Sequence, residues 1–457
     1  MNTAYAVSHA ALLASSETAN TSAYISMFWI ALAAMLSPLI SSMTGKKLPD
    51  VVILLVLGII IGPHALGLAD TSNGVSLLKD LGLGILFLIA GYEVNASALK
   101  TRQGGFAAGT WLVSFALGLV VGGVVTGWAE GIDEMAVFAI ALTSTALGTI
   151  LPMVRNNGKT GTRLGDAILI HGAIGEVLPI FAMALLLSRH NTLISVLILL
   201  GFMLVAFITA VVPHRAFEHI PGLRRTMAAN ASATTQTMLR LAMLILVTLM
   251  MAAAVFELDV VLGAFAAGII LRSLTPHGAF EPFSKRLDVL GFSFLIPLFF
   301  VCSGMGIKVS VLAEEPLVLI GIVFALLTVR GLPVVLCEFF FNTHSGLEST
   351  HERVQLGLYA AAGLPILVAV TNVALHNELI SEKAASLLVA GGALTILIFP
   401  LQATAIHRIF GSTVEEPQES STKEKINRKK SERTKTVRTV TSTMPVVKPS
   451  KATEKTN

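Results

Sequence analysis

The sequence is poor in charge and in cysteine. Only 13% of its 457 residues are charged, whereas 54% are hydrophobic. A soluble protein of this length carries about twice that charged fraction, roughly 25%. The two cysteines, Cys302 and Cys337, lie far apart in apolar runs, which excludes a disulfide scaffold and favours small buried side chains. The HExxH, GxSxG and P-loop motifs are absent, so the sequence supports neither an enzyme nor a cofactor.

The small positive charge belongs to the end of the chain. The formal net charge is +4, but residues 411–457 hold eleven Lys or Arg against six Asp or Glu, which leaves the rest close to neutral. This segment has too few apolar residues to bury a core, and we expect a disordered basic tail. A solvated tail is one interpretation, and contact between Lys423–Lys430 and anionic lipid is the other. Because the basicity is confined to the tail, we expect no nucleic-acid partner.

Apolar runs of about 17–26 residues, long enough to cross a bilayer, recur through most of the chain. They predict an all-α polytopic membrane protein. We expect a short extracytoplasmic segment over residues 1–23, a transmembrane domain over 24–410 and the tail over 411–457. The domain would hold about thirteen helices, near residues 24–44, 50–67, 76–94, 105–128, 134–154, 162–188, 191–212, 235–256, 259–272, 287–306, 316–341, 354–376 and 384–408.

Lysine and arginine sort to alternate loops of this scheme. The loops on the side of the C-terminal tail carry fourteen of these residues, and the opposite loops carry four. Because basic loops stay in the cytoplasm, the asymmetry predicts a cytoplasmic tail. With an odd number of helices the N-terminus lies outside, and the protein is expected in the plasma membrane.

Two charged residues fall near the middle of predicted spans. Glu176 lies about 14 residues from one end of the sixth helix, which puts it roughly 20 Å from that end. Arg330 holds a similar position in the eleventh helix. A lone charge at this depth costs several kcal/mol, so each needs a partner, water or a function. We expect the two to share one hydrated site; a Glu–Arg pair that only locks two helices together is the structural alternative.

Two predicted helices carry signals of interruption. The fifth contains the hydroxyl run Thr143, Ser144 and Thr145, followed by Gly148. The twelfth contains Gly363 and Pro365, and proline removes a helical hydrogen bond. Each is the middle helix of a triple (helices 4–6 and 11–13). This correspondence is typical of inverted-repeat transporters, in which broken helices line the binding site.

The sequence resembles the monovalent cation/proton antiporters, in particular the branch of the Nap-type sodium/proton exchangers and the Kef-type potassium efflux systems. Five short stretches in the family's order carry the resemblance: Lys47–Pro63, Leu81–Glu93, Ala141–Ala146, Val261–Gly268 and Pro297–Met305. It implies a thirteen-helix fold with two broken crossing helices, usually a homodimer, in which a core domain moves against a dimerisation domain.

The resemblance also implies that the family's ion-binding carboxylate falls on Glu176. The family usually has two polar or acidic residues here, whereas this chain has Gly175 before Glu176, so the first is absent. Arg330 falls where the family commonly has a Lys or Arg in the middle of the membrane. The departure at Gly175 leaves a non-transporting sensor or scaffold on the same fold as an alternative function, and a cation uniporter as another.

Competition between a proton and a cation for one carboxylate is enough to couple their fluxes. We therefore expect exchange of sodium or potassium for protons at Glu176, with Arg330 compensating charge. A monovalent cation needs several oxygens, and Thr143, Ser144 and Thr145 are candidates to supply some of them, although such hydroxyls often bond to backbone instead. His171, on the same helix as Glu176, is interpreted first as a packed histidine and second as a pH sensor.

Overall fold

The computed structural model describes residues 2–44, 48–71, 74–94, 96–127, 131–156, 158–187, 192–219, 231–275 and 280–410. These ranges form helices and connecting turns, with no strand among them. The predicted basic tail over 411–457 lies outside the described residues.

The helices follow one another along the chain as follows: α1 (Asn2–Met43), α2 (Asp50–Ile61), α3 (Gly74–Glu93), α4 (Ala96–Leu99), α5 (Arg102–Thr126), α6 (Ile132–Thr143), α7 (Leu147–Asn156), α8 (Arg163–Leu186), α9 (Thr192–His219), α11 (Ala231–Val255), α12 (Val260–Leu274), α13 (Phe280–Leu290), η2 (Gly291–Leu295), α14 (Ile296–Met305), α15 (Val309–Glu314), α16 (Pro316–Leu326), η3 (Leu327–Gly331), α17 (Leu332–Phe340), α18 (Thr350–Ala361), α19 (Pro365–His376) and α20 (Glu382–Phe410).

The all-helical membrane architecture is confirmed. In the described part of the chain, ten helical stretches are long and apolar enough to cross a bilayer, and three shorter apolar helices, Asp50–Ile61, Ile194–Thr209 and Val260–Leu274, accompany them. Large apolar side chains are exposed along several helices, for example Leu112 on α5 and Phe207 on α9. Such surfaces suit contact with lipid tails rather than water. The count of thirteen spans stays a prediction.

The structure differs from the expected helices at several places. α1 begins at Asn2, so the predicted N-terminal segment is largely a continuation of the first helix. α2 ends at Ile61 rather than at residue 67. Pro63 explains this early end, because a proline disfavours the helical conformation of the residue before it, here Gly62. The tenth and eleventh predicted helices each contain a π-helical turn, η2 and η3.

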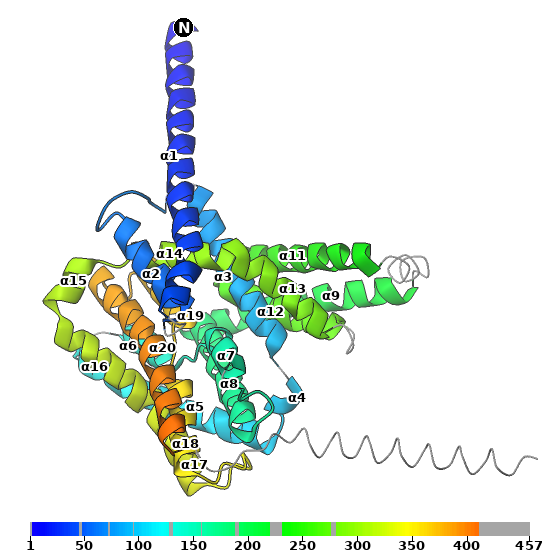
Figure 1. Cartoon of the computed structure of the whole chain (residues 1–457). Helices are drawn as coiled ribbons and strands as arrows, with labels where there is room; N and C mark the ends of the chain where they lie inside the picture. Colours follow the sequence, from blue (N-terminus) through cyan, green and yellow to red (C-terminus); the bar gives the residue numbers. More distant parts are fainter. Residues whose placement is uncertain are drawn as a thin grey trace, which may run out of the picture. The chain divides into compact units, whose positions relative to one another are not determined.

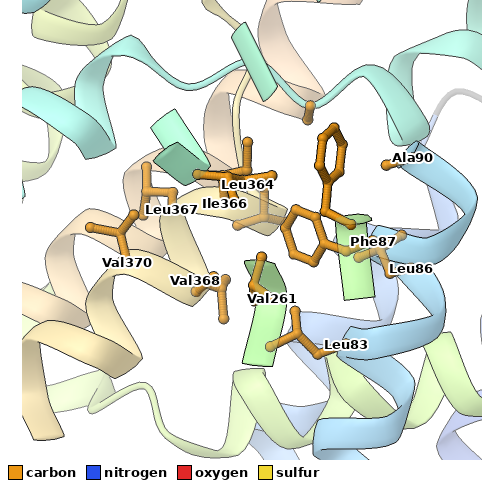
Figure 2. Close-up of a cluster of buried hydrophobic side chains, with 14 of the residues drawn as sticks. Leu83, Leu86, Phe87, Ala90, Val261, Leu364, Ile366, Leu367, Val368 and Val370 are labelled. Carbon is orange, nitrogen blue, oxygen red and sulfur yellow. The ribbon is translucent and has the colours of Figure 1, made fainter. Parts of the chain in front are cut away.

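Small residues let α3 and α12 approach closely. A Cβ on Gly268 would lie 2.2 Å from the Leu88 carbonyl oxygen, and one on Gly91 would lie 2.2 Å from that of Phe265. Close approach through small residues is how helices associate in lipid, where apolar burial alone gives no advantage. Figure 2 shows the adjoining apolar cluster, in which Leu86 and Phe87 of α3, Val261 of α12 and Leu367 of α19 lie together.

Two helix triples surround the candidate site. The first is α5, the interrupted pair α6 and α7, and α8; the second is α16 to α17, the interrupted pair α18 and α19, and α20. Within the second triple, α20 packs against α16 and α18 (Figure 1). The middle member of each triple is broken, as the sequence predicted.

Replacing Gly268 by valine is expected to destabilise the protein. The new side chain would meet the Leu88 backbone, which cannot move without separating α3 from α12. We expect a loss of at least about 2 kcal/mol, within the usual range for overpacking. Thermal unfolding of the purified protein in detergent measures this. The matched control is Gly109→Val on α5, where a Cβ meets no atom within 4 Å; equal melting temperatures for the two variants would contradict the described packing.

Candidate ion-binding site

The two broken helices touch each other at their breaks. α6 ends at Thr143 and α7 begins at Leu147, while α18 ends at Ala361 and α19 begins at Pro365. The Ala146 amide donates to the Ala362 carbonyl at 2.8 Å, and the Thr145 hydroxyl donates to the Ala360 carbonyl at 2.7 Å. Backbone groups at membrane depth must find partners inside the protein. Each break therefore supplies hydrogen-bond partners for polar groups that the other break leaves free.

The predicted break residues hold different positions. Gly363 lies within the second break, where a Cβ would be 2.6 Å from the Ser144 carbonyl oxygen, so only glycine fits the crossing. Pro365 is the first residue of α19, where a missing amide hydrogen costs nothing. Gly148 is the second residue of α7 and so lies after the first break, within the helix.

Glu176 projects from α8 to the start of α7. Its side chain is buried, and its Oε1 accepts a hydrogen bond from the Gly148 amide at 3.2 Å. The N-terminus of a helix attracts negative charge, because its first amides are free to donate and the helix dipole is positive there. Glu176 Oε2 has no hydrogen-bond partner within the described ranges. One carboxylate oxygen is thus held and the other is free to accept a proton or a cation.

The three hydroxyls of the first break all donate to backbone carbonyls. Thr143 Oγ1 donates to Ala139 at 2.7 Å, and Ser144 Oγ donates to Ala141 at 2.9 Å. Thr145 donates across the crossing to α18. Each hydroxyl oxygen keeps lone pairs, so a role as cation ligand stays a prediction, while their visible role is to satisfy backbone.

Arg330 lies in the π-helical turn η3 and is fully buried. Its Nη2 donates to the His171 carbonyl at 2.9 Å, and its Nε donates to Thr145 Oγ1 at 3.3 Å. In the described part of the chain Arg330 forms no ion pair with Glu176, and its Nη1 has no hydrogen-bond partner. The charge is therefore held by a carbonyl and a hydroxyl, next to Gly175. π-Helical turns of this kind occur frequently at functional sites.

Gly175 explains how Arg330 fits so close to α8. A Cβ at Gly175 would lie 2.3 Å from Thr145 Oγ1 and 2.8 Å from Arg330 Nη2. Its carbonyl also accepts the Thr145 amide hydrogen at 2.9 Å. The guanidinium and the Thr145 hydroxyl thus occupy the space that a side chain at residue 175 would need. The absence of a polar side chain at residue 175, where the family has the first member of its pair, is therefore what lets Arg330 occupy this position.

A cavity of about 290 Å³ borders Gly148, the residue whose amide binds Glu176. It is lined by Ile89, Glu93, Gly148, Leu151, Arg155, Asp288 and Phe292. Glu93 Oε1 lies 3.6 Å from Arg155 Nη2, and Arg155 is half exposed. Glu93 has no role in the site predicted from the sequence. The signal that could have identified it is its position as the last residue of the stretch Leu81–Glu93.

Comparisons with known proteins identify the family of the chain. The sequence profile of the family described as "Sodium/hydrogen exchanger, transmembrane" matches residues 30–408. The chain belongs to this family. It is therefore a membrane transporter of cations and protons rather than an enzyme, and the resemblance noted in the sequence is confirmed.

Individual relatives are distant in sequence. GerN of Bacillus cereus, named an Na(+)/H(+)-K(+) antiporter, is 23% identical over 358 residues, which cover 77% of this chain and 88% of that protein. YjbQ of Bacillus subtilis (strain 168) is 22% identical over 417 residues, which cover 87% of this chain and 64% of that protein. The structure of the sodium proton antiporter MjNhaP1 from Methanocaldococcus jannaschii matches with a TM-score of 0.59 at 18% identity, covering 86% of this chain and 99% of that one. This match supports the fold.

Gly175→Ala is expected to disturb the site from within. The added methyl group must displace Thr145 or Arg330, both of which are buried and bonded. We expect a melting temperature several degrees lower, since about 1–3 kcal/mol is typical of overpacking, together with slower exchange. The control is Gly109→Ala on α5, where a Cβ also meets no atom within 4 Å. A Gly175→Ala protein as stable and active as wild type would show that Arg330 does not depend on this glycine.

Proposed function

We propose that the protein exchanges a monovalent cation, sodium or potassium, for protons by alternating access, and that Glu176 is the shared cation and proton site. The observation that carries the proposal is the buried carboxylate with one oxygen held by the Gly148 amide and the other unpartnered within the described ranges. A buried carboxylate of this kind must gain a proton, a cation or water. Proton and cation then exclude each other at one site.

The surroundings of Glu176 support cation access. Gly148 both binds the carboxylate and lines the cavity that contains Glu93 and Asp288. Acidic walls in a cavity of low dielectric raise the local concentration of cations. Arg155, paired with Glu93 at the edge of this cavity, lies on the side of the basic loops. The proposed path therefore leads from that side to Glu176.

Arg330 serves as fixed charge compensation in this proposal. An arginine does not release its proton at working pH, so it stays cationic while Glu176 titrates. Its hydrogen bonds to His171 and Thr145 hold the guanidinium beside Gly175 during exchange. We further propose the expected arrangement in the cell: a homodimer in the plasma membrane, with the C-terminal tail in the cytoplasm and the N-terminus outside.

Glu176→Gln is expected to abolish exchange and to keep the fold, because glutamine matches the shape of glutamate but cannot ionise. Reconstituted vesicles with an imposed pH gradient, a fluorescent pH indicator and added sodium or potassium measure this. The control is Glu281→Gln, which removes an exposed acid that pairs with Lys285 in the next helical turn. Cation-driven dissipation of the gradient by the Glu176→Gln protein at the wild-type rate would overturn the assigned site.

Exchange is expected to be electroneutral, because one titrating carboxylate exchanges one proton for one monovalent cation. Arg330 fills the place beside Gly175 where a second acid would stand. The rate in vesicles should then be independent of a membrane voltage clamped with potassium and valinomycin when sodium is the substrate. A rate that rises or falls steeply with voltage would show that a further charge moves with each cycle.

A further inference from the structure

A second buried acid–base pair lies on the same helices as Glu176 and Arg330. His171 of α8 and Glu338 of α17 are 1% and 5% exposed. His171 Nε2 lies 4.0 Å from Glu338 Oε1, which is ion-pairing distance but too long for a hydrogen bond. Both ring nitrogens and Glu338 Oε1 lack hydrogen-bond partners within the described ranges. Buried polar atoms without hydrogen-bond partners are rare in folded proteins. A proton that the two side chains bind and release would explain why these atoms are kept here.

The other oxygen of Glu338 connects the pair to the protein surface. Oε2 accepts hydrogen bonds from Thr343 Oγ1 at 2.8 Å and from Ser345 Oγ at 2.6 Å. Thr343 is buried and Ser345 is partly buried, while the neighbouring residues His344 and Gly346 are exposed. A chain of hydroxyls thus leads from the loop over residues 341–349 to the carboxylate. This route reaches His171 without passing Glu176.

The same histidine also contacts Arg330. The His171 carbonyl accepts the hydrogen bond from Arg330 Nη2 at 2.9 Å. Arg330 and Glu338 belong to one continuous helical stretch, from η3 into α17. The ring of His171 therefore faces the acid of this stretch while its backbone holds the arginine. A change of charge at the pair acts on Arg330 at short range and in a medium of low dielectric.

We propose that His171 and Glu338 bind one proton between them, and that this proton regulates cation binding at Glu176 through Arg330. Without the proton, the ionised Glu338 balances part of the positive field of Arg330. With the proton, the pair is neutral as a whole and the field of Arg330 acts on Glu176 undiminished. Cation affinity then falls as the pair is protonated. The regulatory effect rests on the proposed exchange at Glu176, whereas the proton site itself does not.

Other titratable groups around the pair lie at the ends of the packed helices or in the adjoining loop. Arg163 and Arg353 donate to the carbonyls of Gly346 and Leu347 and so fix the loop. Arg330 and the uncharged Tyr359 are buried, and the uncharged Cys337 is half-buried. Among the residues whose side chains the structure describes, the remaining charged or titratable ones on elements packed against α8 and α17, or in the loop, are Arg102, Asp133, Glu134, Arg155, Asp166, Arg272, His344, Glu348, His351, Glu352 and His376.

Infrared difference spectroscopy tests the proton site without any transport. The Glu176→Gln protein, titrated in detergent, should show the carbonyl band of a buried carboxylic acid grow as pH falls. Adding Glu338→Gln should make this band smaller, the remainder coming from other buried acids such as Glu93, whose side chain is 10% exposed. Adding Glu348→Gln instead, an acid whose side chain is 89% exposed, should leave the band unchanged. Adding Thr343→Val and Ser345→Ala removes both donors to the ionised carboxylate, so the band should be larger at a fixed pH. A band of the same size with and without Glu338→Gln would overturn the proposal.

Transport measurements test the regulation. Competition at Glu176 alone raises the cation KM at most about tenfold for each unit of falling pH, the limit for one linked proton. A proton and a monovalent cation carry the same charge, so the field of Arg330 weakens both equally and the slope in wild type stays within this limit. The regulation is visible instead at high pH, where Glu338→Gln should raise the cation KM, and the KM values of the two proteins should converge as pH falls and proton competition at Glu176 dominates. A KM that is equal in the two proteins at high pH, or that differs by the same factor at every pH, would overturn the proposal. Exchange that persists in Glu176→Gln contradicts the proposed function instead, and leaves the infrared result for the pair standing.

Discussion

The site depends on one constraint: two interrupted helices can exist at membrane depth only if their freed backbone groups bond to each other. The Ala146 to Ala362 and Thr145 to Ala360 hydrogen bonds do this, and the absence of a side chain at Gly363 lets the chains approach. The crossing leaves the first amides of α7 free to donate, and one of them binds Glu176. The position of the carboxylate therefore follows from how the two breaks satisfy each other.

The charges around the crossing form a connected set. The Thr145 hydroxyl bonds to both α18 and Arg330. Arg330 in turn donates to the carbonyl of His171, which lies five residues before Glu176 on α8. Gly175 makes room for this arrangement. A transporter that must bind and release its cation needs a carboxylate that is incompletely paired, and Arg330 is bonded to Thr145 and His171 rather than to Glu176.

Much of this arrangement could be predicted from the sequence, because it rests on residue types that are expensive in a membrane. Glu176 and Arg330 are isolated charges in long apolar runs, and Gly363 and Pro365 predict a break in their helix. The packing of Arg330 against Gly175 could not be predicted, since the clash involves residues 155 positions apart. The π-helical turn, the cavity beside Glu93 and the facing of His171 and Glu338 likewise depend on how helices rotate against one another, which periodicity alone does not determine.

The central claim is that proton and cation compete for Glu176. Its most direct measurement is the release of protons when sodium or potassium is added to purified protein in weakly buffered detergent solution, away from any membrane. The account predicts proton release that saturates with cation concentration in wild type and is lost in Glu176→Gln, while Glu281→Gln behaves as wild type. Saturable cation binding without proton release, or release that Glu176→Gln retains, would contradict it.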